Sequence, residues 1–316
     1  MAFALDPELA AVLVPSDDSA QASAFELTAR GDALALRAAI DADADLAFAG
    51  LPAFQEVTTA AHVIDVADGR IEARWYTTAE VQPGPAVVYL HGGGLIGGTL
   101  DNYEPSIKLL VDLTGVPFLH VGYRLAPEHR GTTPAEDALA GIRWLLGRSA
   151  ELGVDTARIA VMGDSGGGAV AAGAAILARD AGIELARQVL VYPMLDDCNV
   201  EPDRLLVEHA TWTYDNNFTG WDALLGDQRG GAGVPAAAAP ARLEEFAGLA
   251  PAYVEVGELD IFRDESVSYA SRLWAAGVSC ELHVHPGAPH GHEWIDPDAD
   301  VARRTIADRV RVIRSL

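Results

Sequence analysis

Ser165 lies in a sequence setting that could make its hydroxyl a nucleophile. It is the central residue of Gly-Asp-Ser-Gly-Gly at 163–167, between an apolar run typical of a strand and a run of small residues typical of a helix. A serine in a sharp turn between strand and helix is crowded by the residues two positions away, and glycine at both positions relieves this crowding. Such a serine can attack a carbonyl carbon and carry the acyl group. Asp164 is expected to point away from the hydroxyl and to be structural.

A second glycine-rich segment could stabilise the negative charge that forms during this attack. Gly92, Gly93 and Gly94 follow His91 at the end of the apolar run 86–90. Because glycine has no Cβ, backbone N–H groups in such a segment can point into a cavity and bind an oxyanion. The two glycine-rich segments together favour acyl-transfer chemistry more strongly than either does alone.

A serine nucleophile needs a base, which for a strand–turn–helix serine is expected further along the chain, after an acid. Five histidines follow Ser165, at positions 209, 283, 285, 290 and 292. His283 and His285 fall inside a strand-like run, where a packed or edge histidine is the simpler interpretation. His290 lies in the loop after that run, where a base at the end of a sheet belongs. His290 is therefore the predicted base, and His292 in the same loop is the reserve.

The acid that orients the base is expected near the end of the preceding strand-like run. Asp260 falls where the run 251–259 ends. Asp264 and Glu265 follow in the first turn of a helix-like segment, where acids are common because they complement the helix dipole. Asp260 is the predicted acid for this reason. Glu258, two residues earlier, is the weaker alternative.

These candidates need a scaffold that brings distant parts of the chain together. Strand-like runs alternate with helix-like segments, which predicts a parallel sheet covered by helices on both faces. Before them, two runs separated by Asp68-Gly69 predict a β-hairpin. The strand-like runs cover 86–93, 117–125, 158–164, 186–195, 251–259 and 279–287.

The segment 196–245 departs from this alternation. It carries a group of aromatic side chains and then a stretch rich in glycine, alanine and proline. We expect an inserted cap segment, followed by an irregular return to the sheet. Trp212, Tyr214 and Phe218 are candidate pocket residues, although with Trp221 they equally suit the core of the cap itself.

Composition excludes several partners. The chain of 316 residues has 22 Lys and Arg against 46 Asp and Glu, a formal net charge of −24, which repels phosphate backbones and anionic membranes. No charge-free apolar run reaches about 18 residues, and the first 20 residues carry no cation of the kind that opens a secretory signal. We expect neither a nucleic acid nor a membrane as a partner. We expect a cytoplasmic location. Cys198 and Cys280 are expected to be reduced core thiols.

Six motifs, in order along the chain, resemble the bacterial branch of the hormone-sensitive-lipase family of α/β-hydrolase carboxylesterases. The resemblance runs from about residue 60 to the end of the chain. It implies an α/β-hydrolase fold, with a mostly parallel eight-stranded sheet flanked by helices and a helical cap. The motifs are HGGG (91–94), YRLAPEH (123–129), GDSGG (163–167), YPMLDD (192–197), GELDIFRDES (257–266) and PGAPHGH (286–292).

The resemblance assigns roles to individual residues. Ser165 would be the nucleophile, His290 the base and Asp260 its partner. The oxyanion hole would be formed by Gly92, Gly93, Gly94 and Gly166. Tyr123, Arg124 and Glu128 would brace the loop that carries this hole. The cap would comprise residues 1–50 and 196–230, and the hydrolase core residues 51–195 and 231–316.

Three positions depart from the family pattern. Gly166 stands where the family usually has alanine, and Ile261-Phe262 where Pro-Leu is common. His292 stands where phenylalanine is common, which puts a second imidazole near the base and could perturb the pH profile.

The predicted function is that of a serine carboxylesterase acting on short- to medium-chain esters, with no metal or organic cofactor. Hydrolysis of a lactone or amide, or deacetylation of a small metabolite, would use the same three residues and stays open. A ligand-binding protein without activity is a further alternative, which the presence of all three residues disfavours. The expected partner is a small-molecule ester, and homodimer formation is an open option.

Overall fold

The computed structural model describes residues 3–13, 28–78 and 83–316. Within these residues, eight strands form one sheet in the spatial order β1-β2-β4-β3-β5-β6-β7-β8. β2 runs antiparallel to both of its neighbours, and all other neighbouring pairs are parallel, which confirms the expected mostly parallel sheet. The strands are β1 (Thr58–Val66), β2 (Gly69–Thr77), β3 (Gly84–Leu90), β4 (Phe118–Val121), β5 (Val154–Asp164), β6 (Arg187–Val191), β7 (Ala252–Gly257) and β8 (Cys280–His285).

Burial of the strands follows from their place in the sheet. Central strands are buried on both faces, as Val87 and Val88 of β3 show by their complete burial. β1 lies at one edge and buries only Ile64 among its residues. The predicted hairpin is present, because β1 and β2 pair with Val66 opposite Gly69. The hydrophobic core therefore lies around the central strands of the sheet.

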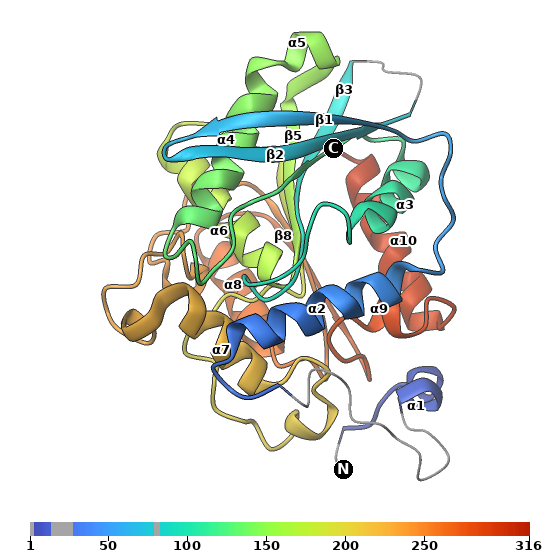
Figure 1. Ribbon diagram of the computed structural model, residues 1–316, viewed down its shortest axis with the longest axis vertical. Helices are drawn as coiled ribbons and strands as arrows, with labels where there is room; N and C mark the ends of the chain where they lie inside the picture. The colour runs from blue at the N-terminus through green and yellow to red at the C-terminus, as the bar shows by residue number, and fades with distance from the viewer. Residues whose placement is uncertain (1–2, 14–27, 79–82) are drawn as a thin grey trace.

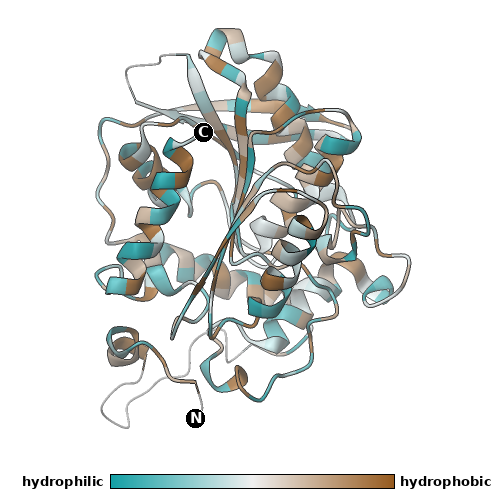
Figure 2. Cartoon of the chain, turned by 180° about the vertical axis from the view of Figure 1, so that it is seen from behind, coloured by the Kyte–Doolittle hydropathy of each residue, from teal (hydrophilic) through white to brown (hydrophobic). Residues whose placement is uncertain are grey.

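Helices cover both faces of the sheet (Figure 1). α3 packs beside α10 on one face, and α4 packs beside α6 on the other. Most of these helices carry both hydrophilic and hydrophobic residues, as expected when one side faces the sheet and the other faces solvent (Figure 2), whereas α6 is buried on nearly all sides. The helices on the two faces are α3 (Glu104–Thr114), α4 (Thr133–Gly147), α5 (Ser149–Leu152), α6 (Gly166–Asp180), α8 (Arg263–Ala275) and α10 (Asp300–Arg314). The short α9 (His292–Ile295) packs against α10, α1 and α2 instead.

The remaining helices gather beyond the carboxyl ends of the parallel strands (Figure 1). They are α1 (Pro7–Leu13), α2 (Ala33–Phe48) and α7 (Tyr214–Leu225). The residues just before α2 are linked to the middle of α7, where the Gly31 N–H donates to Thr219 Oγ1 at 2.9 Å. Residues 14–27 of the expected N-terminal cap segment lie outside the described residues. The division of the chain at residues 50, 195 and 230 stays a prediction.

None of the helices in the described ranges is long and apolar enough to cross a bilayer.

Candidate active site

Ser165 occupies a strained turn between β5 and α6. Its φ is 56° and its ψ is −119°, a backbone conformation that residues other than glycine rarely adopt. The turn is too tight for side chains at the flanking glycines. A Cβ on Gly163 would lie 2.1 Å from the Gly167 oxygen, and one on Gly167 would lie 2.2 Å from the Leu90 oxygen. The two glycines are therefore required by space, for the reason that the sequence suggested.

The structure brings Ser165, His290 and Asp260 into one hydrogen-bonded chain. His290 Nε2 lies 2.9 Å from Ser165 Oγ, and His290 Nδ1 lies 2.7 Å from Asp260 Oδ2. Asp260 is completely buried at the end of β7, and its Oδ1 accepts the Phe262 N–H at 2.9 Å. With its Nδ1–H donated to the carboxylate, the imidazole presents an unprotonated Nε2 to the serine hydroxyl. This arrangement can remove the proton from Ser165.

The weaker candidates for the acid that orients His290 form hydrogen bonds or ion pairs with other residues. Glu258 accepts the Gly287 N–H at 3.1 Å, and Asp264 pairs with the neighbouring Arg263 at 2.7 Å. Asp164 accepts the Tyr89 hydroxyl at 2.5 Å and makes no hydrogen bond to the serine hydroxyl. Burial raises the pKa of Asp164 to about 6.

His292, the reserve base, is fully buried on the far side of its loop. Its Nε2 lies 2.8 Å from the Thr305 hydroxyl of α10. Burial lowers the pKa of His292. Its imidazole is therefore directed to the C-terminal helix and makes no hydrogen bond to Ser165 or Asp260.

The segment 91–98 forms a tight loop beside Ser165. The Gly93 carbonyl accepts the N–H groups of Ile96 and Gly97 at 3.0 and 2.9 Å. In a planar trans peptide the next N–H points the opposite way, so the Gly94 N–H faces away from this turn. A Cβ on Gly166 would lie 2.9 Å from the Gly94 nitrogen, which places that N–H against the serine turn. The loop is therefore shaped to present backbone donors to the neighbourhood of Ser165.

Of the three residues expected to brace this loop, Tyr123 contacts it directly and Glu128 reaches it through Arg37, whereas Arg124 binds elsewhere. The Tyr123 hydroxyl donates to the His91 carbonyl at 2.8 Å, and its ring stacks on the His91 ring with centroids 4.5 Å apart. Glu128 pairs with Arg37 of α2 at 2.6 Å. Arg124 pairs instead with the buried Asp137 of α4 at 2.8 Å.

A cavity of about 940 Å³ opens above Ser165. Its walls come from both expected cap segments, 1–50 and 196–230, and from the loop 91–98, and most of them are apolar. Of the three aromatic side chains predicted to line the pocket, Trp212 is part of this wall. The lining includes Leu5, Val12, Ile40, Ala44, Phe48, Gly92, Gly93, Gly94, Tyr103, Ser165, Tyr192, Trp212, His290, Trp294 and Ile295.

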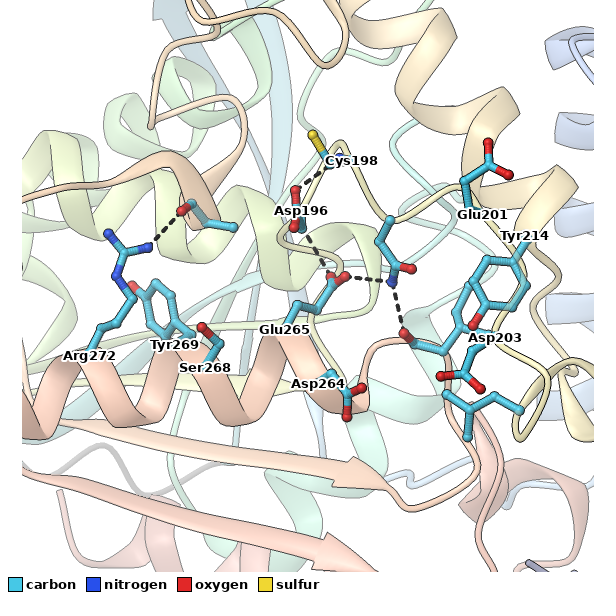
Figure 3. Close-up of a pocket in the computed structure, with 14 residues that line it drawn as sticks. Asp196, Cys198, Glu201, Asp203, Tyr214, Asp264, Glu265, Ser268, Tyr269 and Arg272 are labelled. Atoms are coloured by element: carbon cyan, nitrogen blue, oxygen red, sulfur yellow. Dashed lines mark hydrogen bonds between the residues drawn. The ribbon is translucent and has the colours of Figure 1, made fainter. Parts of the chain in front are cut away.

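The other two aromatic candidates lie elsewhere. Tyr214 lines a second cavity of about 430 Å³, whose walls carry several carboxylates (Figure 3). Phe218 lies between the guanidinium groups of Arg30 and Arg229, at 3.9 and 4.3 Å from its ring centre. Neither lines the cavity above Ser165, because α7 turns these side chains toward other neighbours.

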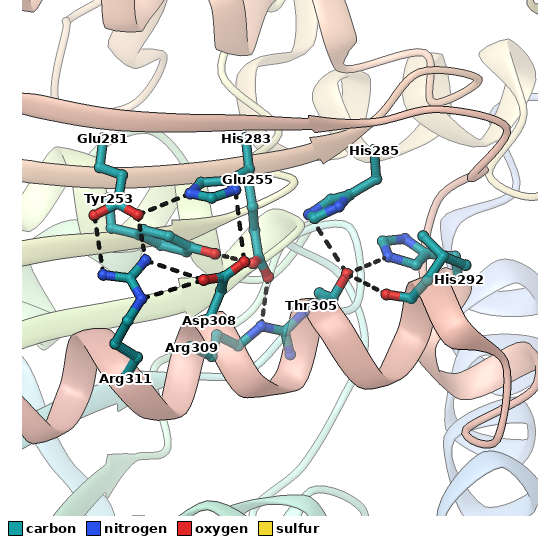
Figure 4. Close-up of polar contacts among 11 residues, drawn as sticks. Tyr253, Glu255, Glu281, His283, His285, His292, Thr305, Asp308, Arg309 and Arg311 are labelled. Atoms are coloured by element: carbon teal, nitrogen blue, oxygen red, sulfur yellow. Dashed lines mark hydrogen bonds and ion pairs between the residues drawn. The ribbon is translucent and has the colours of Figure 1, made fainter.

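A buried charge network that the sequence did not suggest lies behind His290. Arg309 of α10 donates to Glu255 and to Glu293, and Glu293 accepts the Tyr192 hydroxyl at 2.9 Å (Figure 4 shows Arg309 with Glu255). The Tyr192 ring packs edge-on against His290, with centroids 4.5 Å apart. The only sequence signal was that Tyr192 belongs to the motif at 192–197. The network connects the ring packed against His290 to the C-terminal helix α10.

Two groups of side chains in the described residues have the spacing of metal ligands, but both are engaged by arginine. Glu281, His283 and Asp308 form the first group, and Arg311 contacts both of its carboxylates (Figure 4). Asp196, Asp197 and Cys198 form the second group, and Asp197 pairs with Arg242 at 2.6 Å. Cys198 is exposed and Cys280 only partly buried, so the expectation of core thiols was wrong; both are free of disulfides, as expected.

Comparison with known proteins places this geometry in a family. A family model described as the alpha/beta hydrolase fold matches residues 87–293. Ethyl acetate hydrolase of Pseudomonas putida is 37% identical over 225 residues, which cover 66% of this chain and 65% of the relative, just under two thirds of its length. Esterase LipI of Mycobacterium tuberculosis is 36% identical over 251 residues, covering 76% of this chain and 77% of the relative.

Solved structures agree along nearly the whole chain. A bacterial heroin esterase superposes with a TM-score of 0.87 at 35% identity, covering 98% of this chain and 97% of the other. A hyperthermophilic esterase from the archaeon Pyrobaculum calidifontis superposes with a TM-score of 0.86 at 30% identity, covering 99% of both chains. The chain therefore belongs to the α/β-hydrolase family. The resemblance of its motifs to the bacterial hormone-sensitive-lipase branch of carboxylesterases is confirmed by these esterase relatives.

Proposed function

We propose that the protein is a serine carboxylesterase that hydrolyses short- to medium-chain esters through an acyl-enzyme on Ser165. The observation that carries this proposal is the unbroken chain from Ser165 Oγ through His290 to the buried Asp260, at the floor of a cavity. The esterase names of the relatives support the same reaction class.

The reaction would proceed in two acyl transfers. His290 Nε2 takes the Ser165 proton while Oγ attacks the ester carbonyl, and the carbonyl oxygen becomes an oxyanion. The N–H groups of Gly93, Gly94 and Gly166 would hold that oxyanion, with Gly92 completing the loop. His290 then returns the proton to the leaving alcohol. Water attacks the acyl-enzyme with His290 again as base, which releases the carboxylic acid and restores Ser165.

The cavity favours small, uncharged or cationic esters. Its volume of about 940 Å³ lies in the range of small-molecule sites, and the cap residues Ile40, Phe48 and Trp212 supply apolar walls. Asp43 and Glu208 are its exposed acidic residues. Their charge would disfavour an anionic substrate, as would the formal net charge of −24.

Hydrolysis of a p-nitrophenyl ester series from acetate to palmitate tests this proposal. Wild-type protein should turn over the short chains rapidly, and Ser165→Ala should reduce kcat by about 10⁴-fold or more while leaving the circular dichroism spectrum unchanged. Ser149→Ala is the matched control, because Ser149 begins α5 at the opposite end of the molecule (Figure 1). Near-wild-type turnover by Ser165→Ala would overturn the proposal.

The same triad could serve a different acyl compound. Parallel assays with an ester, its isosteric amide and the matching lactone separate carboxylesterase from amidase, deacetylase or lactonase activity. No turnover of any of these by a folded wild-type protein would favour the ligand-binding alternative.

We also propose a homodimer formed through the edge strand β8. Among the described residues β8 pairs with β7 alone, and Val284 of β8 and Trp274 of α8 are exposed large apolar side chains near this edge. An unpaired edge with apolar neighbours is a template for pairing with a second copy. Analytical ultracentrifugation should give a dimer for the wild type and a monomer for Val284→Arg. A monomeric wild type at micromolar concentration would contradict this.

A cytoplasmic location, and the absence of nucleic-acid or membrane partners, are part of the same proposal. The free thiols of Cys198 and Cys280 support a reducing compartment, and the acidic net charge opposes binding to phosphate-rich surfaces. Cell fractionation with an esterase stain tests the location, and recovery of the activity in the membrane or secreted fraction would contradict it.

A further inference from the structure

Three polar side chains on one face of α2 bind the oxyanion loop, defined here as residues 91–98, and Asn102 just after it. Arg37, Asp41 and Asp45 follow each other at intervals of four residues, which places them on one side of a helix. Each of them forms a hydrogen bond with the segment 96–102. A regular row of this kind is a dedicated contact between a cap helix and a loop of the core.

Arg37 makes the most extensive of these contacts. Its guanidinium donates to the Ile96 carbonyl and, at 2.7 Å, to the Ala126 carbonyl, while Glu128 binds its outer edge at 2.6 Å. The hydrogen bond to Glu128 raises the pKa of Arg37. Since the planar guanidinium can donate in several fixed directions at once, one side chain holds the loop at the Ile96 carbonyl and the neighbouring segment 123–129 at the Ala126 carbonyl.

The two aspartates hold the next part of the same segment. Asp41 Oδ1 accepts the Gly98 N–H at 2.7 Å, and Asp45 Oδ1 accepts the Asn102 side-chain amide at 2.5 Å. Arg37 therefore holds a carbonyl, and Asp41 an N–H, on either side of Gly97.

The loop and α2 are closely packed at Gly97, between the hydrogen bonds made by Arg37 and Asp41. A Cβ on Gly97 would lie 2.9 Å from Ile40 Cγ2, and Ile40 is itself nearly fully buried. The loop therefore lies directly on α2, with no room for a side chain between them. The contact is apolar at its centre and hydrogen-bonded on both sides.

The segment held by α2 sets the direction of an oxyanion donor. The N–H groups of Ile96 and Gly97 bind the Gly93 carbonyl, and this bond turns the Gly94 N–H toward the serine turn. If residues 96–98 shift, the Gly93 carbonyl loses its partners and the peptide between Gly93 and Gly94 becomes free to rotate. The direction of the Gly94 donor thus depends on a helix of the cap.

We propose that α2 positions the oxyanion hole, with Arg37 and Asp41 as positioning residues that act through the loop 96–98. This inference rests on the proposed esterase function. Ile40, Ala44 and Phe48 on the same helix line the cavity, so α2 contacts both the substrate space and the oxyanion loop. A helix that only walled the cavity would affect substrate binding, whereas a helix that orients the donors must affect the transition state.

The first test replaces Arg37 by methionine, which keeps the unbranched apolar stem of the side chain and removes every donor. The measurements are kcat and KM on p-nitrophenyl butyrate, and the inhibition constant of a trifluoromethyl ketone, which forms a tetrahedral oxyanion adduct with a serine. Loss of a whole oxyanion donor costs about 10²–10³ in rate, so a displaced donor should lower kcat by about tenfold. The ketone should bind about tenfold more weakly, while KM and inhibition by butyrate stay within about twofold of the wild type.

Arg70→Met is the matched control, because Arg70 makes only an exposed ion pair with Asp65 in the β1–β2 hairpin. This variant should keep the wild-type kcat and inhibition constant. Asp41 supplies an independent pair of variants. Asp41→Ala removes the acceptor for the Gly98 N–H and should lower kcat, whereas Asp41→Asn retains an acceptor oxygen and should restore most of it.

The outcomes are distinct from those of the proposed function. A wild type that hydrolyses esters, with Arg37→Met and Asp41→Ala unchanged in kcat and in ketone binding, would overturn the role of α2 alone. A raised KM at constant kcat would also overturn it, since it would assign α2 to substrate binding only. If Arg37→Met does not fold, the Asp41→Ala and Asp41→Asn pair decides. A wild type inactive on every ester would instead overturn the proposed function.

Discussion

Replacing Gly166 by alanine should force the oxyanion loop away from the serine turn. The new Cβ would lie 2.6 Å from the Leu95 nitrogen, 2.9 Å from the Gly94 nitrogen and 3.0 Å from the Gly94 Cα. These are backbone atoms, so no side chain can rotate to make space.

The size of the effect follows from the geometry. An ordinary contact begins at 3.4 Å, so the loop must retreat by about 0.8 Å at Leu95 and about 0.5 Å at Gly94. A hydrogen bond of about 2.9 Å from the Gly94 N–H would lengthen to about 3.4 Å, beyond the usual limit of about 3.2 Å. Because a whole donor contributes about 10²–10³ in rate, this weakening should lower kcat by about ten- to a hundredfold, or about 1.4–2.7 kcal/mol.

Steady-state kinetics on p-nitrophenyl butyrate measures this effect, with the melting temperature recorded for each variant. Gly147→Ala is the control, because a Cβ at the end of α4 meets nothing within 4 Å. It should leave both kcat and the melting temperature close to those of the wild type. A Gly166→Ala enzyme with a kcat within twofold of the wild type would refute the reasoning, since the donors would then tolerate the retreat of the loop.

Three further variants test the network behind the base. Burial raises the pKa of Glu255 to about 7, above the value of about 4.5 for an exposed glutamate. The folded protein therefore binds this proton more tightly than the unfolded chain does. The resulting contribution to the free energy of unfolding is complete below about pH 4.5 and is lost as the pH rises through 7. In the wild type the loss of this contribution should lower the urea concentration at the midpoint of unfolding between pH 5 and pH 8. Glu255→Gln should make that decrease smaller, and a decrease equal to that of the wild type would contradict the prediction. For Glu293, burial raises the pKa but the charge of Arg309 outweighs it and holds the pKa at about 2. Glu293→Gln should thus lower the free energy of unfolding at pH 7 by about 3 kcal/mol, measured by urea titration, because Arg309 loses a buried partner. His292→Phe should leave the pH profile of kcat/KM unchanged, because its imidazole contacts Thr305, and a shifted profile would show coupling to the base.

The sequence predicted the sheet well because its strands are marked by physical necessity. Strands buried on both faces, such as β3 and β5, must be continuous apolar runs, and the hairpin needs a turn pair such as Asp68-Gly69. The contacts among Ser165, Asp260 and His290 were predictable for a similar reason. Each lies just after a strand, and the carboxyl ends of parallel strands meet at one edge of a sheet.

Contacts that depend on side-chain direction were beyond the reach of the sequence. Tyr214 and Phe218 share a helix near Trp212, but only the rotation of α7 decides that Trp212 alone lines the cavity above Ser165. Arg37 has no motif around it, and its importance arises from a loop far away in the chain. Arg309 resembles the other arginines of an amphipathic helix, yet it is almost completely buried.

The row of contacts from α2 to the oxyanion loop also limits how such enzymes can be redesigned. Exchanging caps between esterases is an attractive way to change which ester is accepted. In this chain a transplanted helix would need its own arginine and aspartate four residues apart, with a small residue facing it in the loop. A chimera without them would react slowly with every ester, and the loss could be mistaken for a change of specificity.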